Sequence, residues 1–104
     1  MDARQAAVAQ EVAALVPTYL ASQSKQVVAA REQLAHRDFD SLRNFGHNLK
    51  GTGRGYGFPE IERIGCELEQ AAQENSEQSI AQGLDALDLF VTGAASRQAS
   101  VRVA

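Results

Sequence analysis

The chain has 104 residues, 44% of them apolar, and a formal net charge of −3. This length suits one domain, so we expect residues 1–104 to form a single domain with its core at about residues 15–95. Many Ala, Gln, Glu and Leu residues and only two prolines favour an all-α fold. The acidic balance argues against the broad basic surface with which proteins bind nucleic acid.

Other classes of protein are disfavoured by features that the sequence lacks. No run of about 18 apolar residues and no signal-like N-terminal segment occurs, so we expect a cytoplasmic chain that does not enter a membrane. Cys66 is the single cysteine, and His36 and His47 are the only histidines, which leaves neither an internal disulfide nor a zinc site. We therefore expect no metal or cofactor on this chain, and we expect Cys66 to be a small, partly buried apolar residue.

The first third of the chain predicts two helices. Residues 2–15 are rich in Ala and offer few core residues, which indicates a short N-terminal helix. Pro17 fits the first turn of a new helix, because a proline there loses no hydrogen bond. Leu20, Val27 and Leu34 then recur near the helical period and carry this second helix to about His36.

Two further helices follow, separated by a tight turn. After a break and cap at Arg37–Asp38, apolar residues and glycines form one stripe along residues 39–56. Gly57 is placed as a left-handed helix stop, and Pro59 as an early residue of the next helix. The apolar stripe of that helix continues to about Glu74.

Asn75 and Ser76 predict a break and an N-cap before the last helix. Apolar residues from Ile80 to Ala94 mark this helix, which we expect to end before a polar tail. Helices joined by short loops pack as antiparallel neighbours. The sequence therefore predicts an all-α, antiparallel up-down four-helix bundle with an additional short N-terminal helix.

The stretch HNLKGTGRGYGFP, residues 47–59, holds four glycines and so raises alternatives to a helix. It contains neither of the nucleotide-binding patterns G-x-x-x-x-G-K-[ST] and G-x-G-x-x-G. Residues 54–58 match the start of an RNA-binding strand motif, but Pro59 then stands where a central strand needs a backbone donor. RNA binding is therefore a disfavoured alternative.

On a helix, the same stretch gathers polar residues on one face. His47, Lys50, Gly51 and Arg54 are related by steps of three or four, so they share one face, which lies opposite the apolar stripe. A lysine one turn from a histidine can hold an anion beside the imidazole, and a glycine removes a side chain that would block another protein.

A carboxylate joins this face if the hairpin reverses around Gly57–Phe58, because Glu69 then lies level with His47. A carboxylate that accepts from one imidazole nitrogen leaves the other deprotonated and nucleophilic. His47 is thereby a candidate phosphoryl acceptor. A surface pair of Glu69 with Arg63 or Arg54 is the alternative that the sequence leaves open.

These residues resemble the histidine-containing phosphotransfer (HPt) domain family. The resemblance covers residues 15 to about 95 and rests on His47-x-x-Lys50-Gly51, Tyr56-Gly57-Phe58-Pro59-Glu60, Cys66-x-Leu68-Glu69 and the opening at residues 15–20. At the position of Glu69 the family has Gln or Glu. The choice of Glu here is similar to that in the phosphorylatable domain of chemotaxis-type histidine kinases. Gly46 departs from the family, which commonly has Ala before the histidine.

The resemblance implies a phosphotransfer protein of a two-component or phosphorelay system. His47 would accept a phosphoryl group on Nε2 and exchange it with an aspartate of a response-regulator receiver domain, or take it from a histidine kinase catalytic domain. Lys50 would contact the phosphoryl oxygens, and Glu69 would orient the imidazole through Nδ1.

The resemblance also implies a docking face for the partner. Gly51 would keep this face clear, and Arg43 and Arg54 would favour an acidic receiver surface. Three glycines would serve close helix packing and the turn: Gly53, Gly55 and Gly57. Such a domain is not an autonomous kinase, and Mg²⁺ is expected on the receiver. A helical adaptor that binds a signalling partner without phosphotransfer is the alternative from a different class.

Overall fold

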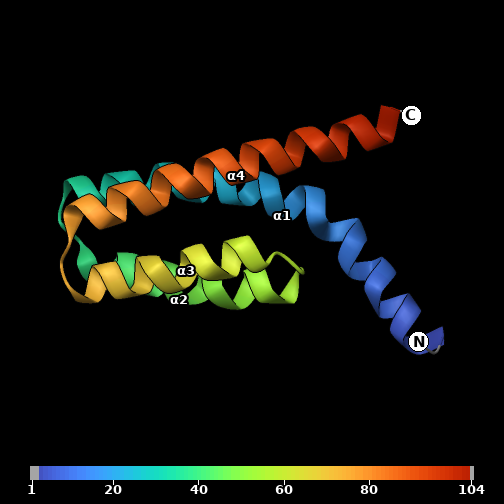
Figure 1. Cartoon of the computed structure of the whole chain (residues 1–104), viewed down its shortest axis with the longest axis horizontal. Coiled ribbons are helices and arrows are strands. Elements are labelled where there is room, and N and C mark those ends of the chain that lie inside the picture. Colours follow the sequence, from blue (N-terminus) through green and yellow to red (C-terminus); the bar gives the residue numbers. More distant parts are fainter. Residues whose placement is uncertain (1–2, 104) are drawn as a thin grey trace.

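The computed structural model describes residues 3–103, which form four helices and the turns between them. The helices are α1 (Ala3–Ala35), α2 (Phe39–Gly55), α3 (Pro59–Gln73) and α4 (Glu77–Val103) (Figure 1). No strand occurs in these residues, so the all-α prediction is confirmed for this part of the chain. The predicted helix start at Asp2 and the domain limits Met1 and Ala104 lie outside the described residues.

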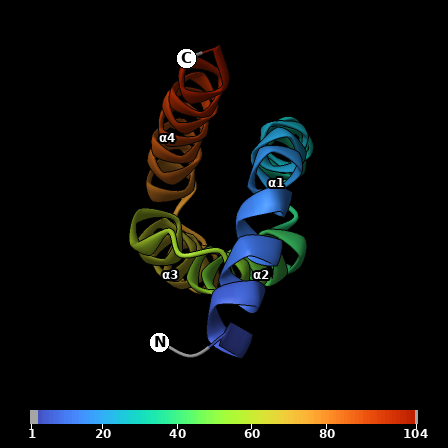
Figure 2. The same ribbon diagram turned by 90° about the vertical axis from the view of Figure 1, so that its right-hand side faces the viewer.

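The helices form a bundle with short connections. Three-residue turns join them, and Figure 1 shows the chain reversing its direction at each turn. In the view of Figure 2 the helices occupy four corners, where α1 lies beside α2 and α4, and α3 lies beside α2 and α4. The most extensive contact is between α2 and α3. These two helices therefore form a tight hairpin, and α1 and α4 cover its apolar side.

Local chemistry explains where the helices begin and end. Asp38 caps α2, because its carboxylate accepts a hydrogen bond at 3.2 Å from the backbone N–H three residues later. The Ser76 hydroxyl caps α4 in the same way, at 3.3 Å. Gly57 has a φ of +80°, a left-handed conformation that glycine adopts without the usual steric cost, and Pro59 is the first residue of α3. The predicted turns are thus confirmed.

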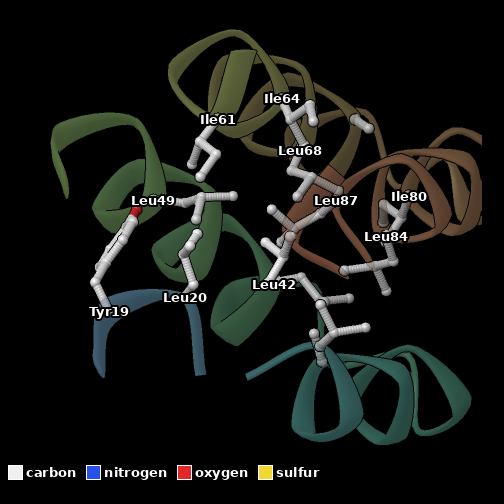
Figure 3. Close-up of a cluster of buried hydrophobic side chains, with 14 of the residues drawn as sticks. Tyr19, Leu20, Leu42, Leu49, Ile61, Ile64, Leu68, Ile80, Leu84 and Leu87 are labelled. Atoms are coloured by element: carbon white, nitrogen blue, oxygen red, sulfur yellow. The ribbon is translucent and has the colours of Figure 1, made fainter. Parts of the chain in front are cut away.

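Buried apolar side chains from all four helices meet in one core, part of which is shown in Figure 3. Burial of such a face on each helix stabilises helices that would be marginal in isolation. The buried apolar residues are Val16, Tyr19, Leu20, Val27, Ala30, Leu42, Leu49, Ile61, Ile64, Leu68, Ala71, Ala72, Ile80, Leu84, Leu87, Val91 and Ala94.

α1 continues through Pro17, so the prediction of a separate N-terminal helix is wrong. A proline inside a helix removes one hydrogen bond and bends the helix without necessarily ending it, and the residues before Pro17 are strong helix formers. Figure 1 shows the N-terminal part of α1 diverging from α4. Leu15 in this part is more than half exposed, as expected for a segment outside the core.

α4 extends to Val103, so the prediction that it ends near Ala94 before a polar tail is also wrong. Residues 95–97 belong to α4 and are exposed, so α4 continues beyond the apolar stripe. No proline follows Ala94, and a helix anchored in a bundle can add one hydrogen bond for each further residue without burying it.

Cys66 is exposed, which contradicts the expectation that it is partly buried. It lies two residues from both Ile64 and Leu68, and two residues turn a helix by about 200°. Because Ile64 and Leu68 point into the core, Cys66 points towards solvent.

The two faces of α4 give a direct test of the core. Leu87 is fully buried and Leu89 is 78% exposed. We expect Leu87→Ala to lower the free energy of unfolding by about 2–5 kcal/mol, because it leaves a cavity among packed side chains. Leu89→Ala is the matched control and should change it by less than about 0.5 kcal/mol. Urea unfolding followed by circular dichroism measures both, and equal losses would contradict this assignment of faces.

Candidate functional site

His47 lies near the middle of α2, on the side that faces away from the core. Leu42 and Leu49 on the same helix are buried, whereas the His47 side chain is 64% exposed. Glu69 of the neighbouring helix α3 lies beside it. The structure therefore brings together the histidine and the carboxylate that the hairpin register pairs.

A hydrogen bond joins His47 and Glu69. The distance from Nδ1 of His47 to Oε2 of Glu69 is 3.0 Å. An ionised carboxylate can only accept, so Nδ1 carries the hydrogen and donates it. In the neutral ring the other nitrogen, Nε2, then holds a lone pair. Because the ring is largely exposed, this lone pair is available to a molecule that approaches from solvent.

Glu69 also binds Lys50, which lies one turn after His47 on α2. Lys50 Nζ donates to Glu69 Oε1 at 2.9 Å, so the two carboxylate oxygens serve two different donors. Hydrogen bonds from Lys50 and then from His47 hold the pKa of the Glu69 carboxyl below its ordinary value, although partial burial acts in the opposite direction. The hydrogen bond and charge of Glu69 raise the pKa of the Lys50 ammonium. Both members of this ion pair are therefore charged at neutral pH.

Glu69 binds neither of the arginines that the sequence offered as partners. The Arg63 guanidinium pairs with Glu60 and Glu67 on its own helix. Arg54 is exposed in the last turn of α2. The carboxylate of Glu69 is thus held at His47 and Lys50, and the surface-pair alternative is not what the structure contains.

The exposed face of α2 around His47 is basic and open. Arg43 and Arg54 lie one turn before and two turns after His47, and both are exposed. The Arg43 guanidinium also has the Asp40 carboxylate 3.9 Å away. Gly51 is exposed one turn after His47, and a Cβ atom at this position would meet nothing within 4 Å. A partner that approaches His47 therefore meets no side chain at Gly51.

Tyr19 anchors α1 to the C-terminal half of α2. Its hydroxyl lies 2.9 Å from that of Thr52, and its ring stacks on Tyr56 with the centroids 4.1 Å apart. Burial raises the pKa of the Tyr19 hydroxyl, so it stays a neutral hydrogen-bonding group. Periodicity alone does not predict this pairing. The contacts of Tyr19 with Thr52 and Tyr56 help to fix the rotation of α2 about its axis, and this rotation turns His47 towards solvent.

Glycines allow the close approach of α2 and α3. Gly53 is buried, and a Cβ atom there would lie 2.7 Å from a backbone nitrogen of α3, so its predicted packing role is confirmed. Gly55, the last residue of α2, is exposed with open space around it, so of the three glycines expected to serve packing and the turn it does not serve the packing. Sequence reasoning did not single out Gly65, which faces Gly46 across the hairpin. The available signal was its place one turn before Glu69, on the buried side of α3.

The structure also bears on metal binding and membrane insertion. Among residues 3–103, no three His, Cys, Asp or Glu side chains are arranged to hold a metal ion. None of the helices in this range combines the length and apolar character that a membrane span requires.

The lowered pKa of Glu69 predicts how stability depends on pH. The folded state holds the charged carboxylate more favourably than the unfolded chain does, so this contribution is complete above the ordinary pKa of about 4.5 and is lost as the pH falls through the lower folded value. Urea unfolding between pH 7 and pH 3 should therefore show a smaller loss of stability in Glu69→Gln than in the parent. Glu11→Gln, at an exposed position of α1, is the control and should follow the parent curve. Parallel curves for Glu69→Gln and the parent would contradict the assignment.

Comparison with known proteins shows the family to which the chain belongs. The family model described as the Hpt domain matches residues 14–97, which is most of the chain. The comparisons with curated proteins and with solved structures gave no match. The matched range includes α2 and α3 with His47, Lys50 and Glu69. The chain belongs to the Hpt domain family, whose members transfer phosphoryl groups through a histidine in phosphorelay systems.

Proposed function

We propose that this chain is the phosphoryl carrier of a two-component phosphorelay. His47 accepts a phosphoryl group on Nε2 and exchanges it with an aspartate of a response-regulator receiver domain. The hydrogen bond from His47 Nδ1 to Glu69 Oε2 carries this proposal. It supports the role because it fixes the tautomer in which Nε2 has its lone pair, on a ring that a partner can reach.

Transfer from a receiver begins when the Nε2 lone pair attacks the phosphorus of the phosphoaspartate. A P–N bond forms, the P–O bond to the aspartate breaks, and the aspartate leaves as a carboxylate with the bonding electron pair. The ring keeps its hydrogen on Nδ1 and becomes positively charged. The Glu69 carboxylate, already within hydrogen-bond distance of Nδ1, stabilises this charge. The reverse steps return the group to a receiver.

Lys50 supplies a positive charge beside the transferred group. Its ammonium has three N–H donors, and the hydrogen bond to Glu69 leaves others for phosphoryl oxygens. Since Lys50 lies one turn from His47, a small movement of its flexible side chain suffices. Lys50 therefore contacts the phosphoryl oxygens while Glu69 holds the ring.

The receiver docks on the exposed face of α2. Gly51 leaves space there, and the exposed Arg43 and Arg54 attract an acidic partner surface, which accelerates association more than it strengthens binding. The receiver brings Mg²⁺ on its own residues and supplies most of the stabilisation of the phosphoryl charge. A histidine kinase catalytic domain is the other donor that this face can serve. In both cases the chain acts as a carrier without kinase activity of its own.

Phosphoryl labelling tests the acceptor. We expect incubation with phosphorylated receiver domains, or with kinase catalytic domains and ATP, to give a label that is stable in base, lost in acid and mapped to His47 by mass spectrometry. His47→Gln should abolish the label while the helical circular dichroism remains, because Gln has no nucleophilic ring nitrogen. His36→Gln removes the other histidine and should keep the label.

A labelled His47→Gln protein would show that another residue is the acceptor. Folded parent protein that takes no label from any donor, and that binds receivers equally well with and without their phosphate, would favour the adaptor function instead. The two results are distinct, because the first assigns phosphorylation to another residue and the second shows that the chain is not phosphorylated at all.

A further inference from the structure

The closest approach of α2 and α3 occurs beside the phosphoryl site. A Cβ atom at Gly46 would lie 2.5 Å from the backbone nitrogen and 2.9 Å from the Cα of Glu69. A Cβ atom at Gly65 would lie 2.8 Å from the Cα of Lys50 and 2.9 Å from the carbonyl oxygen of Gly46. Each glycine thus packs directly on the backbone of a residue whose side chain belongs to the site.

The atoms that a methyl group would meet here cannot rotate out of the way. They belong to the helical backbone, which is held by its own hydrogen bonds, so a methyl group at Gly46 or Gly65 has to push α3 away from α2. Real Cβ atoms do not approach other atoms at such distances, and the required shift is therefore unavoidable.

The side chain of Glu69 has little freedom to follow such a shift. One oxygen accepts from His47 at 3.0 Å and the other from Lys50 at 2.9 Å, so both ends of the carboxylate are committed. A rotation that restores one hydrogen bond after α3 moves outward turns the other oxygen away from its donor. Separation of the helices at this point therefore weakens the contact to His47, to Lys50 or to both.

We propose that Gly46 and Gly65 are positioning residues for phosphoryl transfer: they set the separation of α2 and α3 at which a single carboxylate reaches both His47 Nδ1 and Lys50 Nζ. This role rests on the proposed function of His47. It also gives a physical reason for Gly46, where the HPt resemblance leads one to expect Ala.

The chain supplies matched controls for this role. Gly55→Ala adds the same methyl group to the same helix where nothing lies within 4 Å, away from the docking face at Gly51. Gly53→Ala adds a methyl group that would lie 2.7 Å from the α3 backbone. This position is nearly two turns from His47 and close to the turn that joins α2 and α3. The first control reports a surface substitution, and the second reports a packing clash away from the site.

The test reads the His47 ring directly by ¹⁵N nuclear magnetic resonance, at a pH high enough for the ring to be neutral. With Nδ1 fixed as the donor, the two ring nitrogens have well-separated shifts. In Gly46→Ala and Gly65→Ala we expect the two shifts to move towards each other, and we expect both control variants to keep the separation of the parent. Folded and unfolded chains give separate signals, so the folded population is read even in a destabilised variant.

Labelling by phosphoramidate, a small phosphoryl donor, supplies the second readout. We expect Gly46→Ala and Gly65→Ala to slow the labelling of His47 on the order of 10-fold or more, as misplacement of a catalytic group by a fraction of an ångström does. Parent-like ring shifts in both variants would overturn the positioning role, whatever the labelling rates. Altered ring shifts together with a parent that takes no label from phosphoramidate, from receiver domains or from kinase domains would overturn the proposed function and leave the glycines only their effect on the contact between Glu69 and His47.

Discussion

The separation between α2 and α3 is the constraint on which the site depends. His47 and Lys50 come from one helix and Glu69 from the other, so no single element contains the site. Each glycine inside a helix costs up to about 1 kcal/mol relative to alanine. Burial of the apolar faces of the two helices offsets this cost, and the glycines in turn permit a backbone contact that larger residues would prevent. The close packing of α2 against α3 and the hydrogen bonds of Glu69 to His47 and Lys50 therefore depend on the same few helical turns.

The other two helices keep this hairpin oriented. α1 and α4 cover the apolar side of α2 and α3, which leaves the polar face of α2 towards solvent. Tyr19 bonds to Thr52 and stacks on Tyr56, so α1 also resists rotation of α2 about its own axis. Ion pairs of Arg31 on α1 with Asp85 and Asp88 on α4 lie on the exposed surface and add little to stability. The core, rather than surface charge, holds the site helix in place.

Features with a local physical cause were predictable from the sequence, and features that depend on the distance between helices were not. The caps at Asp38 and Ser76 and the turn at Gly57 follow from the preferences of single residues, and the pairing of His47 with Glu69 follows from the hairpin register. The continuation of α1 through Pro17 was not predicted, because whether a proline ends a helix or only bends it depends on the residues around it. The extent of α4 was missed because polar residues neither stop a helix nor reveal its continuation. The contact of Gly46 with Gly65 was missed because periodicity gives the face of a helix but not its separation from the next.

The exposure of the site is consistent with a carrier that must give up the group as readily as it accepts it. A phosphoryl group adds about −2 charges beside Glu69, and the opposing charges are the Lys50 ammonium and the ring with its hydrogen on Nδ1. Near solvent these attractions are weak, because water screens them. A site that enclosed the phosphoryl group would bind it in the ground state and slow its release, since only interactions that strengthen in the transition state accelerate transfer. In the proposed function, His47, Lys50 and Glu69 therefore position and polarise the nucleophile, and the charge stabilisation that drives transfer arrives with the partner and leaves with it.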